Sequence, residues 1–519
     1  MSATKILMIA TWCFGQLSAL PGLPQVDSFK HWIDEFNRMD ENPLPCSYPN
    51  DKAWEFLAAN VPLFSCPDRE FERTVWFRWW TLRKHIKQTP DGWIVTEFLP
   101  KVSWAGKHNG IGCPGMHHFR EARWFLNRQI LDDYGTYWLR KGGGVRSYSF
   151  PIADSLWQRY LVTGDQNQVV DLLPELIANY DAWEKSHRSP SGLYWQIDDR
   201  DGMEVSIGGS GQRVTINSYQ YGDALAIAQI AELAGKNEIA VDFRKRAETI
   251  RRLVLLNLWD EKAEFFKVRS EDGKPLADVR ELHGFTPWYM NMVGADQTVA
   301  WRQLMDHNGF FAPCGLTSAE RRHPKFSLNY SGHECQWNGP AWPFATSVTL
   351  TGLANLLNGP EQDVVSKSDY FKLLKIYADS HRRVREDGVV VPWIDENLHP
   401  LTGDWISRTI LKNNHWNSGK GGKERGKDYN HSTFADLLIT GLIGLRPRED
   451  NKVEVNPLCP ENTWAWFSID KISYHGYQLT ITYDSDGRHF GKGAGLYVLA
   501  NGQEIARSAH LTRVTGILP

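Results

Sequence analysis

The chain has 519 residues, of which 42% are hydrophobic and 23% are charged, close to the usage of ordinary globular proteins. These proportions exclude a disordered, collagen-like or coiled-coil chain. The formal net charge of -3, from 58 basic and 61 acidic residues, provides no basic footprint for nucleic acid. We therefore expect a folded protein without a nucleic-acid partner.

Tryptophan is unusually frequent, with 23 copies in the chain. Such flat rings can stack against sugars, and they can equally fill the space between packed helices. Composition alone leaves both uses open.

Residues 1–19 have the features of a secretory signal peptide: Lys5, an apolar run over 6–14, and the small residues Ser18 and Ala19. A buried first helix of the domain is the alternative interpretation. No other segment approaches 18 consecutive apolar residues, so we expect no membrane span. The protein is accordingly expected to be secreted.

Removing this leader would leave six cysteines, an even number compatible with up to three disulfides. They are Cys46, Cys66, Cys113, Cys314, Cys335 and Cys459. Their wide spacing lacks the C-x-x-C pattern of structural zinc sites. Pairing cannot be read from the sequence.

Helical periodicity dominates the chain up to about residue 445. Phe243, Ala247, Ile250 and Val254 recur at the spacing of one helix face. Helices are predicted, in chain order, over 69–86, 121–139, 152–162, 169–186, 218–233, 243–254, 341–357 and 369–384, with a strand over 93–98. Consecutive helical pairs of this kind predict a mainly α toroid or bundle.

The pattern changes after residues 446–448. Short alternating or β-branched runs over 464–469, 477–483 and 495–500 are separated by Asp-Gly and Asn-Gly turns. The predicted domains are a leader (1–19), a helical catalytic domain with a mixed N-terminal part (20–445) and a small C-terminal β module (446–519).

Several common catalytic templates are missing from the sequence. No Gly-rich phosphate loop lies between a strand and a helix, and there is no G-x-S-x-G elbow. His333-Glu334 lacks the second histidine of an H-E-x-x-H zinc motif. Nucleotide, serine-hydrolase and zinc-hydrolase chemistry are therefore disfavoured.

One acidic segment suits sugar chemistry. Asp198, Asp199, Asp201 and Glu204 lie within seven residues, just after Trp195. Glycoside hydrolysis needs a protonated carboxyl and a second carboxylate, and crowding raises the pKa of neighbouring acids. A solvated turn is the alternative, as is a calcium-binding loop, although the spacing does not follow the EF-hand pattern.

A second candidate carboxylate lies between two aromatic residues. Asp395-Glu396 is flanked by Trp393 and Trp405 in a Pro-containing segment, a setting that would hold an acid against a sugar. A third segment, 333–343, leads into a helix and by itself indicates only capping chemistry.

Four motifs together resemble glycoside hydrolase family 63 and the related mannosylglycerate hydrolases. The segment 337–343 (WNGPAWP) resembles their W-R-G-P-x-W motif, and 396–403 (ENLHPLTG) is similar to E-N-Y-x-P-x-T-G. Gly202-Met203-Glu204 resembles their G-M-D turn, and 151–157 resembles W-P-W-D-x-W. The similarity spans about 115–445.

This resemblance implies an (α/α)6 barrel and hydrolysis with inversion, in which Glu204 is the general acid and Glu396 the general base. The two carboxyls would then stand roughly 6.5–9.5 Å apart. It also implies that Asp154 and Trp157 bind sugar hydroxyls, while Trp337, Asn338 and Trp393 line the subsite.

The sequence departs from the family pattern at two of these places. Glu204 stands where the family has Asp, and Asp201 is an adjacent alternative acid. Asn338 replaces the family's Arg, which affects the expected sugar specificity more than the reaction class.

Four further residues are weaker candidates for substrate binding. Arg120 and Glu121 lie at a probable helix start, where a salt bridge would explain them equally well. His431 precedes the last predicted barrel helix and could reach the pocket. Trp195 is included because it adjoins the acidic segment.

The expected function is an inverting, exo-acting glycoside hydrolase that cleaves terminal sugars from oligo- or polysaccharides. No cofactor is expected, and the sequence leaves a metal requirement open. One alternative is a polysaccharide lyase or epimerase that uses Tyr330, His333, Tyr429 or His431 as acid and base. The other is a carbohydrate-binding protein without catalysis. The sequence leaves the sugar, the linkage and the oligomeric state open.

Overall fold

A computed structural model describes residues 22–519, so the predicted leader lies outside the described residues. The N-terminal part contains α1 (Lys30–Met39), α2 (Ala53–Asn60) and α3 (Arg69–His85), followed by the hairpin β2 (Ile86–Thr89) and β3 (Gly92–Val95). Helix α3 begins where Asp68 accepts hydrogen bonds from the backbone N–H groups of Glu70 and Phe71. Its Trp76, Trp79 and Trp80 are all buried, as core residues.

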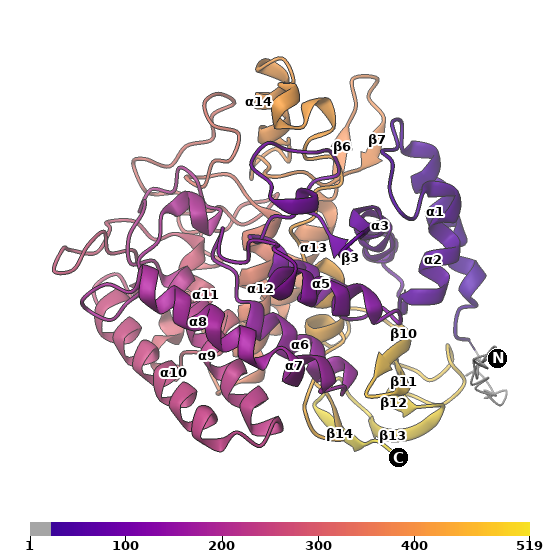
Figure 1. Cartoon of the computed structure of the whole chain (residues 1–519). Helices are drawn as coiled ribbons and strands as arrows, with labels where there is room; N and C mark the ends of the chain where they lie inside the picture. The colour runs from indigo at the N-terminus through magenta and orange to yellow at the C-terminus, as the bar shows by residue number, and fades with distance from the viewer. Residues whose placement is uncertain (1–21) are drawn as a thin grey trace, which may run out of the picture.

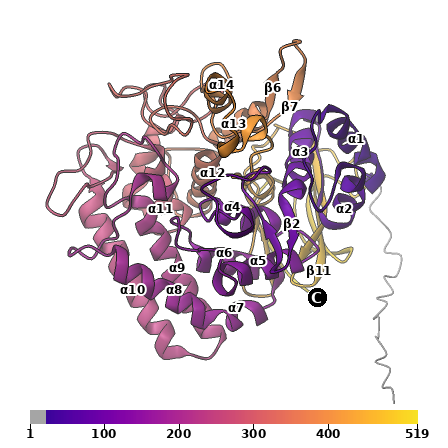
Figure 2. The ribbon, with the colours of Figure 1, turned by 45° about the horizontal axis from the view of Figure 1, so that its top comes forward.

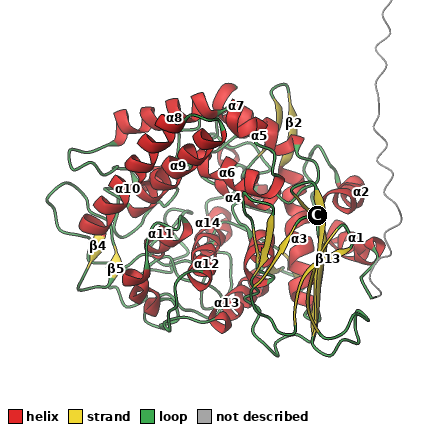
Figure 3. Ribbon diagram, turned by 90° about the horizontal axis from the view of Figure 1, so that it is seen from below, coloured by secondary structure: helices red, strands yellow, loops and turns green. Residues whose placement is uncertain are grey.

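Helices make up most of the regular secondary structure of the remaining chain up to residue 445 (Figure 1). The helices are α4 (Gly115–Ala122), α5 (Gln129–Arg140), α6 (Ile152–Thr163), α7 (Asn167–Asp171), α8 (Leu173–His187), α9 (Val214–Leu233), α10 (Asn237–Leu258), α11 (Thr286–Tyr289), α12 (Pro343–Asn358), α13 (Lys367–Ser380), α14 (Ile406–Asn413) and α15 (Phe434–Leu437). Short hairpins join β4 (Trp259–Asp260) to β5 (Phe265–Phe266) and β6 (Arg382–Val384) to β7 (Val390–Pro392). The long helices α8, α9 and α10 lie together on one side of the molecule in all three ribbon views (Figures 1, 2 and 3).

Two predicted helices are interrupted in the structure. The 121–139 prediction breaks after Ala122, because the backbone N–H groups of Leu126 and Asn127 bind the carbonyl and side-chain oxygens of Asn60 instead. The 169–186 prediction is split into α7 and α8, and Pro174 lies in the first turn of α8, where its missing N–H costs no helix hydrogen bond.

A third predicted helix ends early. The prediction over 369–384 stops at Ser380, and the chain turns into the β6–β7 hairpin. Gly388, with φ of 80°, makes the tight turn, and the β-branched Val384 and Val390 pair across the ladder.

The C-terminal region is rich in strands, as predicted. Its main sheet has the order β1-β10-β11-β12-β13, from β1 (Leu63–Ser65), β10 (Trp466–Tyr474), β11 (Tyr477–Asp484), β12 (Gly495–Ala500) and β13 (Gln503–Ser508). A second sheet has the order β14-β9-β8, from β14 (Val514–Ile517), β9 (Lys452–Val455) and β8 (Leu445–Arg446).

The C-terminal sheet is completed by the N-terminal part of the chain. Strand β1 pairs antiparallel with β10, so that Phe64 lies opposite Ile469. The sheet therefore lies beside the N-terminal helices, as Figure 2 shows for β11 and α1 to α3. One strand of the N-terminal part thus belongs to the same sheet as the strands that follow residue 446.

One tryptophan ties this sheet to the helices. Trp464 lies 5.1 Å from Phe71 of α3, 5.6 Å from Phe371 of α13 and 6.3 Å from Phe64 of β1, measured between ring centroids. Aromatic contacts of this kind stabilise a core beyond the area that they bury.

The six cysteines that the structure describes are all free thiols, so none of the possible disulfides is formed. Within residues 22–519, no helix is both long enough and apolar enough to cross a membrane.

We expect Trp464→Ala to destabilise the protein by roughly 3–5 kcal/mol, the usual loss for a buried Trp. Trp466→Ala is the matched control, because that ring is only half-buried and stacks on His489. Thermal unfolding followed by circular dichroism compares the two variants. An equal, small fall in Tm for both would show that the sheet and the helices are stable independently of each other.

Candidate active site

The predicted acidic segment forms a short helical turn followed by a strained loop. The turn spans Asp198–Asp201, and Gly202 then adopts φ of 72°. A Cβ at Gly202 would lie 2.2 Å from the sulfur of Cys113, so only glycine fits here. Val205, a β-branched residue, also has a positive φ of 64°. Such a conformation costs on the order of 1–3 kcal/mol and is frequent at functional sites.

Contacts from distant segments hold this loop. The backbone N–H of Trp337 donates to the carbonyl of Glu204 at 3.0 Å, which joins the acidic loop to the W-N-G-P segment. The carboxylate of Glu281 accepts from the N–H groups of Ile207 and Gly208, at 2.8 and 3.2 Å. The half-buried Glu204 is thus presented from a fixed backbone.

The environment of Glu204 favours its protonated form. Burial raises the pKa of Glu204 to about 8, and the negative charges of Asp199 and Glu396 act in the same direction. A carboxyl of this kind retains its proton at neutral pH and can deliver it.

Asp201, the alternative acid, is held in a buried ion pair. Arg213 donates to it from Nε at 2.6 Å, and Thr215 donates a second hydrogen bond to the same oxygen. Both partners of the Asp201–Arg213 pair are fully buried. Arg213 also binds Ser206 and the carbonyl of Gly209, so this ion pair braces the loop that carries Glu204.

The second predicted carboxylate, Glu396, is fully buried after strand β7. Arg425 donates to its Oε1 from Nε at 2.7 Å and to its Oε2 from Nη2 at 3.2 Å. The thiol of Cys335 donates to Oε2 at 3.2 Å. Two-pronged binding by a guanidinium favours the ionised carboxylate and fixes its orientation.

Arg425 belongs to a glycine-rich loop, 414–427, that covers Glu396. It also donates to Glu334 at 2.5 Å, and Lys420 of the same loop donates to that oxygen at 2.5 Å. Burial alone would raise the pKa of Glu334, but the hydrogen bond from Lys420 and the charge of Arg425 lower it to about 2. At Gly426 the loop passes so close to Asp395 that a Cβ would lie 1.9 Å from its Oδ1.

A third carboxyl lies in the same neighbourhood. Burial raises the pKa of Glu97 to about 8; the hydrogen bond from the Tyr429 hydroxyl opposes this shift, and the charge of Glu396 adds to it. Glu97 is therefore a second protonated carboxyl close to Glu396.

Aromatic side chains pack against one another around the 337–343 segment. Trp337 stacks on Trp342 with centroids 4.5 Å apart, and His431 lies 5.9 Å from Trp342. Burial lowers the pKa of His431 well below its usual value, so the ring is neutral. The side-chain oxygen of Asn338 is buried, and no hydrogen-bond donor within residues 22–519 reaches it.

An open cleft of about 750 Å³ lies beside the acidic loop. Trp195 and Trp104 line it, and both are more than a third exposed. Tyr148 and Arg200 also line this cleft, and the charge of Glu204 contributes to the raised pKa of Tyr148. Trp104 in turn lies 4.7 Å from the Arg425 guanidinium. Neither Glu204 nor Glu396 lines the cleft itself, which meets the acidic loop at Arg200 and the Arg425 loop at Trp104.

Other predicted substrate residues lie elsewhere. Asp154 is 3.5 Å from Arg120 and accepts from Gln158, while its backbone N–H donates to Asp223. The guanidinium of Arg120 lies over the ring of Tyr289. These residues belong to α4, α6, α9 and α11 rather than to the loops that carry Glu204 and Glu396.

Glu121 and Trp157 are also packed within the helices. The carboxylate of Glu121 accepts from the backbone N–H groups of Ala435 and Asp436, at 3.1 and 2.9 Å, and so caps the start of α15. Trp157 is buried against Tyr160. These contacts explain both residues without a substrate.

Trp393 faces a separate cavity. Its ring lies beneath the guanidinium groups of Arg383 and Arg408, and none of Glu204, Glu396 and Arg425 lines that cavity.

The residues of the lyase alternative are divided between two places. Tyr429 and His431 are neighbours, with ring centroids 3.8 Å apart, but burial raises the pKa of Tyr429 well above its usual value. Tyr330 instead donates to Asp404 at the separate cavity, and His333 is exposed.

Sequence reasoning missed several residues around the candidate carboxylates. Cys335 and Arg425 contact Glu396 directly. Lys420 binds Glu334, Glu281 holds the loop that follows Glu204, and Glu97 is bound by Tyr429. The glycine- and lysine-rich run 419–427 was the available signal, because such a run can place cationic side chains over a buried acid. Among the described residues, no group of three or more His, Cys, Asp or Glu side chains is arranged to hold a metal ion.

The sequence matches two known families. Residues 107–432 match the mannosylglycerate hydrolase MGH1-like glycoside hydrolase domain, and residues 445–507 match the C-terminal domain of glycosyl hydrolase family 65. The first match includes Glu204, Glu396 and Arg425.

Solved structures provide a second comparison. A protein titled sialidase is 41% identical, with a TM-score of 0.88, over 95% of this chain and 45% of that one. The chain therefore spans less than half the length of this relative. The GH78 family rhamnosidase of Bacillus sp. GL1 (12% identity, TM-score 0.53, 82% of this chain and 40% of that one) and the α-L-rhamnosidase of Dictyoglumus thermophilum (14%, 0.51, 82% and 43%) share the fold.

The family match covers well over half of the sequence and includes both loops that carry the candidate carboxylates. The chain belongs to the mannosylglycerate hydrolase MGH1-like glycoside hydrolase family.

Proposed function

We propose that this protein is a glycoside hydrolase that inverts the anomeric centre, with Glu204 as general acid and Glu396 as general base. The observation that carries the proposal is the contrast between these two carboxyls. Burial raises the pKa of Glu204 to about 8, whereas Glu396 is enclosed in a two-pronged ion pair with Arg425. A protonated acid together with a second, differently placed carboxyl is what hydrolysis of a glycoside requires.

Glu396 retains capacity to bind a water molecule. An ionised carboxylate has about four lone-pair sites. Arg425 and Cys335 occupy three of them, one on Oε1 and two on Oε2. The remaining site on Oε1 is available for the attacking water, from which Glu396 would take a proton.

The neighbouring cleft suits a saccharide. Trp104, Tyr148 and Trp195 offer ring faces for stacking, and Arg200 offers hydrogen-bond donors to hydroxyl groups. Because Glu396 itself is fully enclosed, we propose that the enzyme accepts the end of a chain and acts in the exo sense.

The wider setting is also part of the proposal. We infer that the helices form the (α/α)6 barrel that the family resemblance implies, and that the protein is secreted. The consecutive paired helices support the barrel. The signal-like sequence of residues 1–19 supports secretion.

The first experiment is NMR of the reaction mixture, following the anomeric proton of the newly released sugar. The substrate panel should include mannosylglycerate, α-L-rhamnosides and sialosides, because similar proteins carry those names. We expect a product of inverted configuration. A retained configuration would exclude Glu396 as a base acting on water, and an unsaturated product would indicate a lyase.

We expect Glu204→Gln and Glu396→Gln each to lower kcat by about 10²- to 10⁴-fold while the fold is kept. The choice of leaving group distinguishes the general acid from the general base, because the departing oxygen of a very acidic phenol needs little protonation. With such an aryl glycoside, the kcat of Glu204→Gln should therefore recover, whereas the kcat of Glu396→Gln should stay low.

Asp201→Asn is the matched variant for the acid. It breaks a buried ion pair, so we expect its Tm to fall substantially. Loss of turnover on poor leaving groups only, with Tm unchanged, would instead assign the acid to Asp201.

The pH profile follows from the pKa of Glu204. The acid is active when protonated, so kcat/KM should fall as pH rises through about 8. In Glu204→Gln this alkaline decline should disappear. Glu97 also has a pKa of about 8, so Glu97→Gln is the control and should keep the decline. The reverse result would mean that Glu97 governs the profile.

A further inference from the structure

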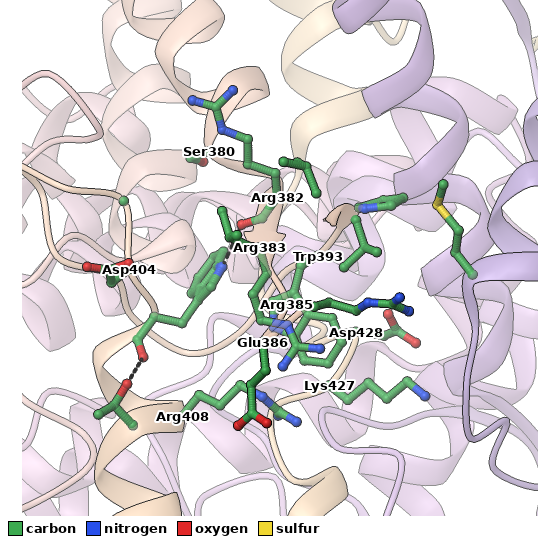
Figure 4. Close-up of a pocket in the computed structure, with 18 of the residues that line it drawn as sticks. Ser380, Arg382, Arg383, Arg385, Glu386, Trp393, Asp404, Arg408, Lys427 and Asp428 are labelled. Atoms are coloured by element: carbon green, nitrogen blue, oxygen red, sulfur yellow. Dashed lines mark hydrogen bonds between the residues drawn. The ribbon is translucent and has the colours of Figure 1, made fainter. Parts of the chain in front are cut away.

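A second cavity, of about 1020 Å³, is lined by Trp393, which lies three residues before Glu396 in the sequence (Figure 4). The β6–β7 hairpin, the end of α1 and helix α14 contribute to its walls. Its volume is in the range of small-molecule binding sites. None of Glu204, Glu396 and Arg425 lines it, so it is distinct from the proposed catalytic centre.

Two arginines surround Trp393 in this cavity. The guanidinium carbon of Arg383 lies 3.9 Å from the Trp393 ring centroid, and that of Arg408 lies 4.5 Å from it. Arg408 is also 5.2 Å from the ring of Trp416. Figure 4 shows Arg383, Arg408 and Trp393 gathered in the same cavity.

Both guanidinium groups have unused donors. Arg408 is only 9% exposed, yet its Nη1 has no hydrogen-bond acceptor among the described residues, and the nearest oxygen of Asp395 is 3.6 Å away. The Nε of Arg383 is likewise buried without an acceptor in residues 22–519. A buried donor without a partner costs about 1–3 kcal/mol, which a bound acceptor would recover.

The acidic residues of the cavity are already engaged. Glu41 and Asp387 bind Arg385, Glu386 binds Lys412, and Asp40 binds Lys84 and Lys427. Of the remaining acids, Asp379 binds Lys375, Glu424 binds Lys427 and Asp428 binds Lys84. Asp404 accepts hydrogen bonds from the hydroxyls of Thr402 and Tyr330.

The cations are not all matched in this way. Of the lining residues in the described chain, Arg382, Arg383 and Lys423 have no ion-pair partner within residues 22–519. The cavity thus presents three cationic side chains that no carboxylate of the described residues engages, within a lining of seven cations and eight acids.

Aromatic side chains provide the rest of the lining. Trp80, Trp405, Trp416 and Tyr330 all border the cavity. Ring faces beside charged hydrogen-bond donors are the combination that binds a sugar carrying an anionic group.

We propose that this cavity binds an acidic sugar, with the sugar's carboxylate held by Arg383 and Arg408. Guanidinium groups match a carboxylate in charge and in planar geometry. The site is separate from the hydrolytic carboxylates, and its existence does not depend on the proposed glycosidase activity.

Asp395 connects this cavity to the segment that carries Glu396. Asp395 faces Arg408 with Oδ2, at 3.6 Å, and accepts from the backbone N–H of Glu396 with Oδ1, at 2.9 Å. A carboxylate bound to Arg408 would compete with Asp395 for this cation.

Binding can be measured by isothermal titration calorimetry with the full chain, using glucuronate and N-acetylneuraminate as acidic sugars. Glucose is the neutral control, and inorganic phosphate tests an anion without a sugar. We expect both acidic sugars to bind, glucose to bind at least tenfold more weakly, and added salt to weaken the acidic ligands.

The variants test the assignment to Arg383. Arg383→Gln should weaken acidic-sugar binding at least tenfold, and Arg383→Lys should retain part of it. Arg302→Gln is the matched surface control, since that side chain is 66% exposed, and it should bind as the wild type does. Glu396→Gln should also retain binding, which separates this site from the catalytic one.

Several outcomes would overturn the proposal. They are equal binding of glucose and glucuronate, tighter binding of phosphate than of either acidic sugar, unchanged affinity in Arg383→Gln, or loss of binding in Glu396→Gln. Circular dichroism and Tm of each variant ensure that a lost affinity is not a lost fold.

Discussion

The buried contact between Arg425 and Glu396 joins loops that lie far apart in the sequence. Through the same guanidinium Arg425 also reaches Glu334, and Trp104 lies against it. A lone carboxylate in this interior would be costly, and the ion pair is what permits an ionised acid there. The enclosed position of Glu396, the path of the glycine-rich loop and the neighbouring cleft all depend on this contact.

The two candidate acids differ because their surroundings differ. Asp201 and Glu204 are three residues apart, yet one is neutralised by Arg213 and the other has only negative neighbours. Sequence proximity therefore did not distinguish them, whereas the partner of each side chain does.

Much of the fold was predictable from local pattern. Helical periodicity located most helices, and strand β12 occupies the predicted residues. The misses have tertiary causes: Asn60 captures the backbone that would have continued α4, and β6 ends the α13 prediction by pairing with β7. Periodicity within one segment contains no information about such partners. Likewise, family motifs located Glu204 and Glu396, but not Arg425 or Glu97, whose roles come from contacts across the chain.

The pairing of β1 with β10 has a consequence for how the protein is made. Leu63 is paired with Asp470, so the first strand of the sheet must wait for about 400 residues to be synthesised. At typical rates of translation this delay is roughly 20 to 80 seconds. During that time the β1 segment and the aromatic residues around it have no final partner on the ribosome. The segment is therefore a natural place for a chaperone to bind the nascent chain, and its release would be coupled to completion of the C-terminal sheet.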